Sequence, residues 1–348
     1  MRHRAPRIVA TLMLALLAAL VCERLHVPLP WMIGPLLVTA LGGVLGAPVD
    51  AAEPLRNVGQ WAIGTALGLY FTPDVLRSIA ALAPALLAGI AWALLLGFLF
   101  YRVLASVSQA SSASEHATAF FAAAIGGASE MAVLGERHGA RVDRVAAAHS
   151  LRVLIVVVAI PVGLQWAGLR GIDVTPPGPD RVHAGGLLLL AALTLLAALL
   201  LNRLRWPNPW VLGALAVALV LTGSGIELSA LPRALTNAGQ LFIGVALGTR
   251  FTPAFARSAP RWMAAVALGT VAMIVLSAAF AWAVSQAAGL HWTTVMLGTS
   301  PGGIAEMCIT AKVMQLGVPV VTAFHVTRYV VVLLATAPLY RWIARGWT

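Results

Sequence analysis

Long apolar stretches separated by short polar loops run along the whole chain. In the first half they cover about 8–21, 31–45, 58–71, 79–103, 117–134 and 145–165, and in the second about 186–201, 210–221, 238–247, 262–288, 293–313 and 320–343. Continuous runs rich in Leu, Ala, Val and Gly are typical of membrane helices, whereas a transmembrane barrel shows alternating segments of about ten residues. The pattern predicts an all-α polytopic membrane protein.

The composition supports this prediction and argues against a soluble globular protein and a nucleic-acid-binding protein. Of the 348 residues, 60% are hydrophobic and only 10% are charged, which is too little polar content to cover a globular surface. The net charge of +11 comes from basic residues that sit singly in short loops. We interpret them as signals that orient the loops in the membrane, so no direct nucleic-acid partner is expected.

The beginning of the chain resembles a secretory signal peptide, because basic residues 1–7 precede the apolar stretch 8–21. A similar stretch at 187–201 lies in mid-chain, where no signal peptide can be. We therefore expect the first stretch to be a retained helix with a cytoplasmic N-terminus. The two cysteines, Cys22 and Cys308, lack any paired spacing, so we predict no disulfide, metal site or cofactor.

The chain repeats itself after roughly 180 residues, a period typical of a duplicated half-transporter. The matching blocks occur in the same order in both halves: 28–34 with 207–213 (PWxxG), 57–60 with 237–240 (NxGQ), 71–73 with 251–253 (FTP), 126–131 with 302–307 (GGxxEM) and 149–152 with 325–328 (HxxR). We predict a first membrane repeat over 1–168, a linker over 169–183 and a second repeat over 184–348.

The fifth apolar stretch of each half decides the topology. If it crosses the membrane, each half has six crossings and the loop arginines divide almost evenly between the two sides. If it is broken or re-entrant, most arginines fall on the cytoplasmic side, as the positive-inside rule requires. We therefore predict inverted repeats with a broken or re-entrant helix in each half.

The candidate substrate- or ion-binding residues lie in the GGxxEM and HxxR blocks. They are Gly126, Gly127, Ser129, Glu130, His149, Arg152, Ser300, Gly302, Gly303, Glu306, His325 and Arg328. Charged groups at membrane depth are costly, so each is by default a candidate functional group. Asn57, Gln60, Asn237 and Gln240 are candidates for lining a cavity or capping a helix. No catalytic residue is predicted, and an enzyme is the less favoured class.

Each kind of candidate residue has two interpretations. Burial raises the pKa of a carboxyl group and a nearby arginine lowers it, so a glutamate beside an arginine could exchange protons; alternatively, a fixed Glu–Arg pair pins two helices. The histidines could relay protons, but we favour hydrogen bonds to a neighbouring helix. The glycine pairs could interrupt helices or permit close packing. Broken helix ends near arginines favour an anionic ligand.

These motifs resemble those of the AbrB family of bacterial membrane proteins, whose members often carry the labels ammonia monooxygenase or AbrB-type regulator. The resemblance extends from the first apolar stretch to about Trp342, although Ser129 is replaced by Ala305 in the second copy. It implies a multi-pass protein of the bacterial inner membrane. The order of the motifs is also similar, more distantly, to cation/proton antiporters and bile-acid-type symporters.

We therefore expect a secondary transporter or exporter of a small metabolite, with an anion slightly favoured, coupled to protons or cations through the buried Glu, Arg and His residues. The expected partners are membrane lipids and a small-molecule or ion substrate, and a homodimer is left open. A membrane-embedded regulator of gene expression and a membrane monooxygenase are the alternatives. A monooxygenase would need copper or iron ligands, and His149 and His325 belong to separate halves.

Overall fold

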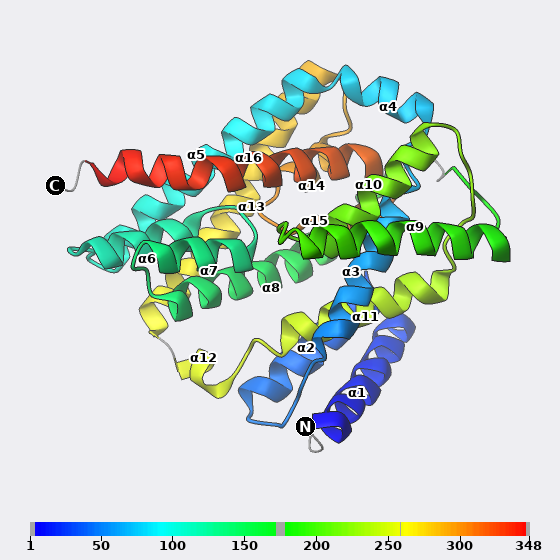
Figure 1. Ribbon diagram of the computed structural model, residues 1–348. Coiled ribbons are helices and arrows are strands. Elements are labelled where there is room, and N and C mark those ends of the chain that lie inside the picture. The colour runs from blue at the N-terminus through cyan, green and yellow to red at the C-terminus, as the bar shows by residue number, and fades with distance from the viewer. Residues whose placement is uncertain (1–3, 172–177, 258, 346–348) are drawn as a thin grey trace. The chain divides into compact units, whose positions relative to one another are not determined.

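The computed structural model describes residues 4–171, 178–257 and 259–345, so that residues 172–177 of the predicted linker and residues 1–3 of the basic N-terminus lie outside the described part (Figure 1). The described residues form helices: α1 Arg4–Arg24, α2 Pro30–Val44, α3 Glu53–Gly68, α4 Pro73–Ala80, α5 Ala83–Val107, α6 Ala113–Ala123, α7 Ala128–Arg137, α8 Val142–Trp166, α9 Ala184–Arg203, α10 Pro209–Gly223, α11 Arg233–Gly248, α12 Pro253–Arg257, α13 Pro260–Ala288, α14 Trp292–Thr299, α15 Ile304–Met314 and α16 Val318–Ala344.

Six of these helices are long and apolar enough to cross a membrane, within the residues that the structure describes: α1, α5, α8, α9, α13 and α16. The described residues include no strand. The predicted class, an all-α polytopic membrane protein, is therefore confirmed. The orientation of the two halves relative to each other stays a prediction.

The fifth apolar stretch of each half is interrupted. In the first half α6 ends at Ala123 and α7 begins at Ala128, and in the second α14 ends at Thr299 and α15 begins at Ile304. Both interruptions lie at the Gly-Gly pairs, which can leave the helical conformation at little steric cost. None of the four resulting half-helices, α6, α7, α14 and α15, reaches the roughly 20 residues that a full crossing requires.

The FTP blocks begin two short helices that hydropathy does not predict. The hydroxyl of Thr72 accepts a hydrogen bond from the backbone N–H of Val75 at the start of α4, and Thr252 does the same for Phe255 at the start of α12. Threonine is a good N-cap and proline suits the first helical position, so Thr-Pro starts a helix in each half.

The chain forms two compact units, each built from segments of both halves. Unit 1 comprises Met1–Ala81, Pro161–Ala256 and Cys308–Pro319, and unit 2 comprises Leu82–Ile160, Arg257–Met307 and Val320–Thr348. The compact units and the repeats therefore divide the chain differently. That the repeats 1–168 and 184–348 act as domains stays a prediction.

Close contacts in unit 1 join helices from different halves. A Cβ at Gly59 of α3 would lie 2.7 Å from the carbonyl oxygen of Gly239 of α11, and a Cβ at Gly239 would lie 3.1 Å from that of Gly59. Similarly, a Cβ at Gly244 would lie 2.6 Å from the carbonyl oxygen of Met32 on α2. These glycines allow the backbones to approach closely, as small residues do in membrane helix packing.

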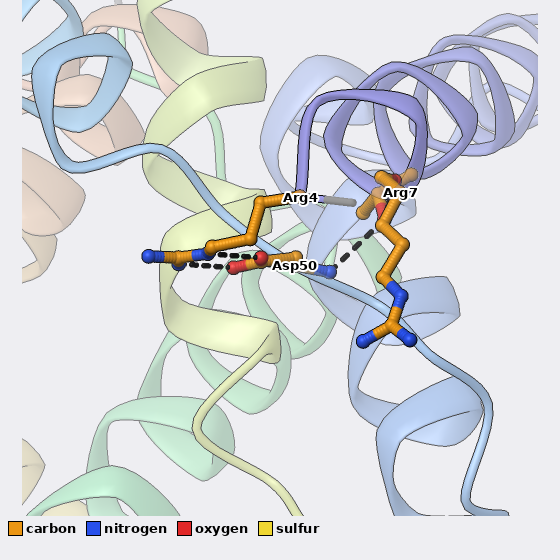
Figure 2. Close-up of polar contacts among 4 residues, drawn as sticks. Arg4, Arg7 and Asp50 are labelled. Carbon is orange, nitrogen blue, oxygen red and sulfur yellow. Dashed lines mark hydrogen bonds and ion pairs between the residues drawn. The ribbon is translucent and has the colours of Figure 1, made fainter. Parts of the chain in front are cut away.

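The start of α1 is fastened to the loop before α3 within unit 1 (Figure 2). Arg4 donates two hydrogen bonds of 2.8 Å to the carboxylate of Asp50, and the backbone N–H of Asp50 donates to the hydroxyl of Thr11 at 3.1 Å. The hydrogen bond from Arg4 holds the pKa of Asp50 below its usual value. These hydrogen bonds hold the first helix to the loop before α3.

Unit 2 has an aromatic and aliphatic core that positions the first interruption. Phe120 and Phe121 at the end of α6 pack against Tyr340 of α16, with ring centroids 5.4 and 5.1 Å apart. Trp92 of α5 stacks on Phe280 of α13 at 4.5 Å. The core therefore fixes the C-terminal end of α6 where its backbone leaves the helix.

Candidate functional site

The two helix interruptions, residues 124–127 and 300–303, form the candidate site in unit 2. Ala124 and Ser300, which follow the last residues of α6 and α14, have extended backbone conformations, with ψ of 133° and 148°. Hydrogen bonds of a continuous helix therefore cannot satisfy the last carbonyl groups of α6 and α14 or the first N–H groups of α7 and α15. Such ends need partners from elsewhere in the protein.

Each histidine of the HxxR blocks binds a carbonyl group near one interruption. The Nε2 atom of His149 lies 2.9 Å from the carbonyl oxygen of Phe121, and that of His325 lies 2.9 Å from the carbonyl oxygen of Leu297. A carbonyl oxygen only accepts, so Nε2 carries the proton in both residues. The favoured interpretation, a hydrogen bond to a neighbouring helix, describes both contacts.

The other ring nitrogen of each histidine accepts from an arginine. Arg152 Nη2 lies 2.8 Å from Nδ1 of His149, and Arg328 Nη2 lies 2.9 Å from Nδ1 of His325. Because arginine only donates, both imidazoles are neutral in this arrangement. A second proton on Nδ1 would break the contact with arginine. Both ring nitrogens are engaged, so neither imidazole offers a lone pair to a metal ion.

The two arginines donate different numbers of hydrogen bonds to backbone carbonyl groups at the interruptions. Arg328 Nη1 and Nη2 donate to the carbonyl oxygens of Ser300 and Gly302 at 2.6 and 2.7 Å. Arg152 Nη1 donates to the carbonyl oxygen of Ala123 at 3.4 Å. A cation at a helix C-terminus is stabilising because that end carries partial negative charge.

The glutamates of the GGxxEM blocks lie in the first turns of α7 and α15. The Oε2 atom of Glu130 lies against Gly127, and that of Glu306 lies against Gly303, so closely that a Cβ on either glycine would collide with the carboxylate. A negative charge is favourable at a helix N-terminus. The second glycine of each pair therefore makes room for the carboxylate in the first turn of the following half-helix.

Tyr329 also lies at the candidate site, although its sequence position did not indicate this. Its hydroxyl donates to Oε1 of Glu130 at 2.9 Å, and its side chain is buried, with 8% exposed. The equivalent position in the first half is Val153, which follows Arg152 as Tyr329 follows Arg328. The signal that could have found it is a hydroxyl beside the HxxR block in only one of two copies.

Each interruption lies against the long helix of the other half. A Cβ at Gly127 would lie 3.1 Å from Cε2 of Tyr329 on α16, and a Cβ at Gly302 would lie 3.0 Å from Cγ1 of Val156 on α8. Unit 2 thus brings together the GGxxEM and HxxR blocks of both copies. Arg152 lies in no ion pair with a described carboxylate, so the structure provides no fixed Glu–Arg pair for this arginine.

The remaining candidates have different surroundings. Ser129 is exposed, whereas Ser300 is buried and its hydroxyl donates to the carbonyl oxygen of Met296 at 2.6 Å. The cavity-lining candidates all lie in unit 1, on α3 and α11 beside the Gly59–Gly239 contact: Asn57, Gln60, Asn237 and Gln240. Among the described residues, no three or more His, Cys, Asp or Glu side chains gather where they could hold a metal ion.

The fold and these contacts define an all-helical membrane protein with two interrupted helices. At each interruption a His–Arg pair binds backbone carbonyl groups, and a glutamate lies in the first turn of the helix that follows. Residues 31–344 match the family described as "Transition state regulatory protein AbrB". The chain therefore belongs to the AbrB family, and the resemblance inferred from its motifs is confirmed.

Two relatives match over most of their lengths. The chain is 26% identical over 341 residues to "Uncharacterized protein YhjN" of Bacillus subtilis (strain 168), covering 89% of this chain and 86% of that protein. It is 23% identical over 336 residues to "Putative regulator AbrB" of Escherichia coli (strain K12), covering 95% of this chain and 94% of that protein. Their similarity spans both units.

Proposed function

We propose that this protein is a secondary transporter or exporter of a small metabolite, coupled to protons or cations, in the bacterial inner membrane. The observation that carries the proposal is the pair of interrupted helices in unit 2, with opposite charges at their broken ends. Broken helices in carriers place free backbone groups where a solute or ion binds. In this proposal the N-terminus is cytoplasmic and the repeats are inverted.

Anionic metabolites are the favoured substrates in this proposal. Two buried guanidinium groups, Arg152 and Arg328, lie on the long helices beside the interruptions, and Arg152 is in no ion pair with a described carboxylate. The buried Nε of Arg152 has no partner in the described part of the chain. A buried polar donor without a partner is costly, and an anion could provide one.

A thermal-shift screen followed by a flux assay tests the proposal. A ligand that binds only the folded protein at 100 times its Kd stabilises it by about 2.7 kcal/mol, which raises the unfolding midpoint. Purified protein would be screened against matched panels of small anionic, neutral and cationic metabolites. Each ligand that stabilises the protein would then be tested for counterflow into proteoliposomes, with Arg152→Met as the variant expected to weaken anion binding.

Counterflow of a stabilising anion that Arg152→Met reduces would support the proposal. Stabilising ligands that show no movement across the bilayer would contradict a carrier. Stabilisation by cations alone would contradict the anion preference and leave transport to be judged by the counterflow result.

The names of the relatives favour a second candidate function, a membrane-embedded regulator that affects gene expression. The family description and the Escherichia coli relative both carry a regulatory name. A regulator of this kind predicts that deletion changes transcript levels and that Glu130→Gln restores them as well as the wild-type gene does. If complementation requires Glu130, expression depends on the candidate site, and the carrier is favoured.

A further inference from the structure

One end of unit 2 is rich in arginine. The C-terminal parts of α5, α7 and α16 and the first turns of α8 and α13 meet at this end around a cluster of buried hydrophobic residues. The arginines on or beside these segments include Arg102, Arg137, Arg141, Arg144, Arg261 and Arg341. At the opposite ends of the same long helices, the segments 83–92, 153–160 and 276–290 contain no Asp, Glu, Lys or Arg. We call the arginine-rich end the basic end of unit 2.

Carboxylates offset only part of the charge of the basic end. Asp143 forms an ion pair of 3.2 Å with Arg141, and Glu115 accepts hydrogen bonds from backbone N–H groups before α6. Glu136 lies near the end of α7. Apart from Arg141, the arginines named above form no ion pair with a described carboxylate. The basic end therefore attracts an anionic partner.

The starts of α8 and α13 meet at the basic end. The guanidinium carbon of Arg144, in the first turn of α8, lies 5.9 Å from the ring centroid of Trp262, in the first turn of α13. Trp262 is 4% exposed, and its indole N–H has no hydrogen-bond acceptor among the described residues. A covered donor without an acceptor is costly, and a ligand oxygen would satisfy it. Because α13 begins without a side-chain cap, its first backbone N–H groups also favour an anion.

An exposed apolar stripe on α13 begins beside the same junction. Arg261 is exposed in the first turn of α13, and Leu268, Val271 and Val275 follow it at helical spacing, with 72%, 49% and 62% exposed. Residues at this spacing lie on one face of a helix. Since α13 is long and apolar enough to cross a membrane, this face meets acyl chains. A partner at Arg261 therefore combines an anionic group with an apolar chain, which a free phosphate ion does not.

We propose that the junction of α8 and α13 binds the headgroup phosphate of an anionic phospholipid. Arg144 and Arg261 donate to the phosphate oxygens, and the acyl chains lie along the apolar stripe of α13. The indole N–H of Trp262 donates to the same phosphate once Arg144 has moved from the ring to the ligand. This inference goes beyond the proposed carrier function and holds whether or not the protein moves a solute. Arginines that serve only to orient the loops would show no preference among lipids.

Lipid titration of the purified full-length protein in detergent tests the site. Phosphatidylglycerol and phosphatidylcholine with the same acyl chains would be added separately, and native mass spectrometry would measure the lipid-bound fraction. The ammonium group of phosphatidylcholine offsets its phosphate, so we expect phosphatidylglycerol to bind at least tenfold more tightly and to raise the unfolding midpoint. Glycerol phosphate, which has the anionic group without acyl chains, should bind at least tenfold more weakly than phosphatidylglycerol.

Three variants locate the site. Arg144→Gln/Arg261→Gln should weaken phosphatidylglycerol binding about thirtyfold, the equivalent of about 1 kcal/mol for each arginine near an anionic lipid. Trp262→Phe keeps an aromatic ring and removes the N–H donor, so it should weaken binding about tenfold. Arg24→Gln/Arg170→Gln, the matched control, removes exposed arginines of unit 1 and should leave the affinity within about twofold.

Circular dichroism and the unfolding midpoint without added lipid would show that each variant is folded. If Trp262→Phe does not fold, the arginine pair and its control decide. Equal binding of the two phospholipids, or equal weakening by the arginine pair and its control, would overturn the proposal. An unchanged affinity in a folded Trp262→Phe variant would also overturn it, because the lipid would then lie away from the junction. Binding of glycerol phosphate as tight as that of phosphatidylglycerol would assign the basic end to a free anion instead.

Discussion

The two helix interruptions of unit 2 share the same motifs but are held in different ways. Both have a histidine 2.9 Å from a carbonyl oxygen near the end of the first half-helix and a glutamate folded over a glycine at the start of the second. At the second interruption Arg328 donates two short hydrogen bonds to backbone carbonyl groups, whereas at the first Arg152 donates one longer hydrogen bond. At the first interruption the hydroxyl of Tyr329 also donates to Glu130. The shared motifs thus bind the second interruption through more and shorter arginine hydrogen bonds than the first.

The largest expected effect is the loss of Arg328. Arg328→Met should lower the free energy of unfolding by about 3 kcal/mol, because two carbonyl groups and the Nδ1 atom of His325 lose their donor. Arg152→Met should lower it by only about 1 kcal/mol, since one weak contact and one hydrogen bond are lost. Both values would come from reversible unfolding in mixed micelles, with methionine chosen to keep most of the buried volume.

Equal losses in the two methionine variants would contradict the difference between the interruptions. A larger loss of unfolding free energy in Arg152→Met would mean that the first interruption is held more strongly than the second. Circular dichroism before unfolding would establish that both variants retain the helical content of the wild type.

The glycines beneath the glutamates provide the next test. Gly303→Ala should lower the free energy of unfolding by about 1–3 kcal/mol, because the new methyl group displaces the carboxylate of Glu306. The double variant Gly303→Ala/Glu306→Ala should lose less than the sum of the two single variants, with an interaction energy of about 1 kcal/mol. A double-mutant cycle in unfolding experiments measures this value.

The same cycle at Gly127 and Glu130 sharpens the comparison. A Cβ at Gly127 would also approach Tyr329, so removal of the carboxylate relieves only part of the collision. We expect a smaller interaction energy there than at Gly303. Strictly additive effects at both sites would show that the glycines are needed for a reason other than the glutamates.

Much of this fold follows from its sequence, because membrane helices are set by local apolar runs. The stretches 145–165 and 262–288 became α8, Val142–Trp166, and α13, Pro260–Ala288. Both Gly-Gly pairs lie at helix interruptions, one of the two interpretations that the sequence left open. The short helix α4 was not predicted, since hydropathy does not register a Thr-Pro start.

The candidate site was only partly accessible from the sequence. The repeat identified the glutamates, arginines and histidines, because a charge within an apolar segment stands out in each copy. Tyr329 escaped notice because a tyrosine in an apolar stretch resembles an ordinary packing residue, and only the structure shows its hydroxyl at Glu130. Comparison of the copies emphasises shared residues, whereas the difference between these interruptions depends on unshared ones.

Substitution of the two histidines should have similar effects, because their contacts are the same at both interruptions. His149→Phe and His325→Phe each remove one hydrogen bond of 2.9 Å to a carbonyl group and one contact with arginine. Both should lower the free energy of unfolding by about 1–2 kcal/mol and agree to within about 0.5 kcal/mol. Unequal losses, measured in the same micelles as the arginine variants, would mean that the difference between the interruptions extends to the histidines.

The smallest expected effect concerns how the two interrupted helices begin. Ser112 accepts from the backbone N–H of Glu115 at the start of α6, and Glu115 accepts from the backbone N–H groups of Ser111 and Ser112, a capping box that α14, preceded by His291, lacks. These backbone hydrogen bonds lower the pKa of Glu115 to about 2. Because the folded-state pKa lies below that of the unfolded chain, Glu115 contributes stability above the unfolded-state pKa.

This contribution should be lost as the pH falls through the unfolded-state pKa toward 2. Glu115→Gln should therefore lower the unfolding midpoint slightly at pH 7, and the difference from the wild type should shrink between pH 5 and pH 3. His291→Gln, at the start of α14, should show no such convergence over the same range. If the Glu115→Gln difference stays constant with pH, the carboxylate charge does not stabilise α6, and the first interruption depends on its hydrophobic contacts with Tyr340 to hold α6 in place.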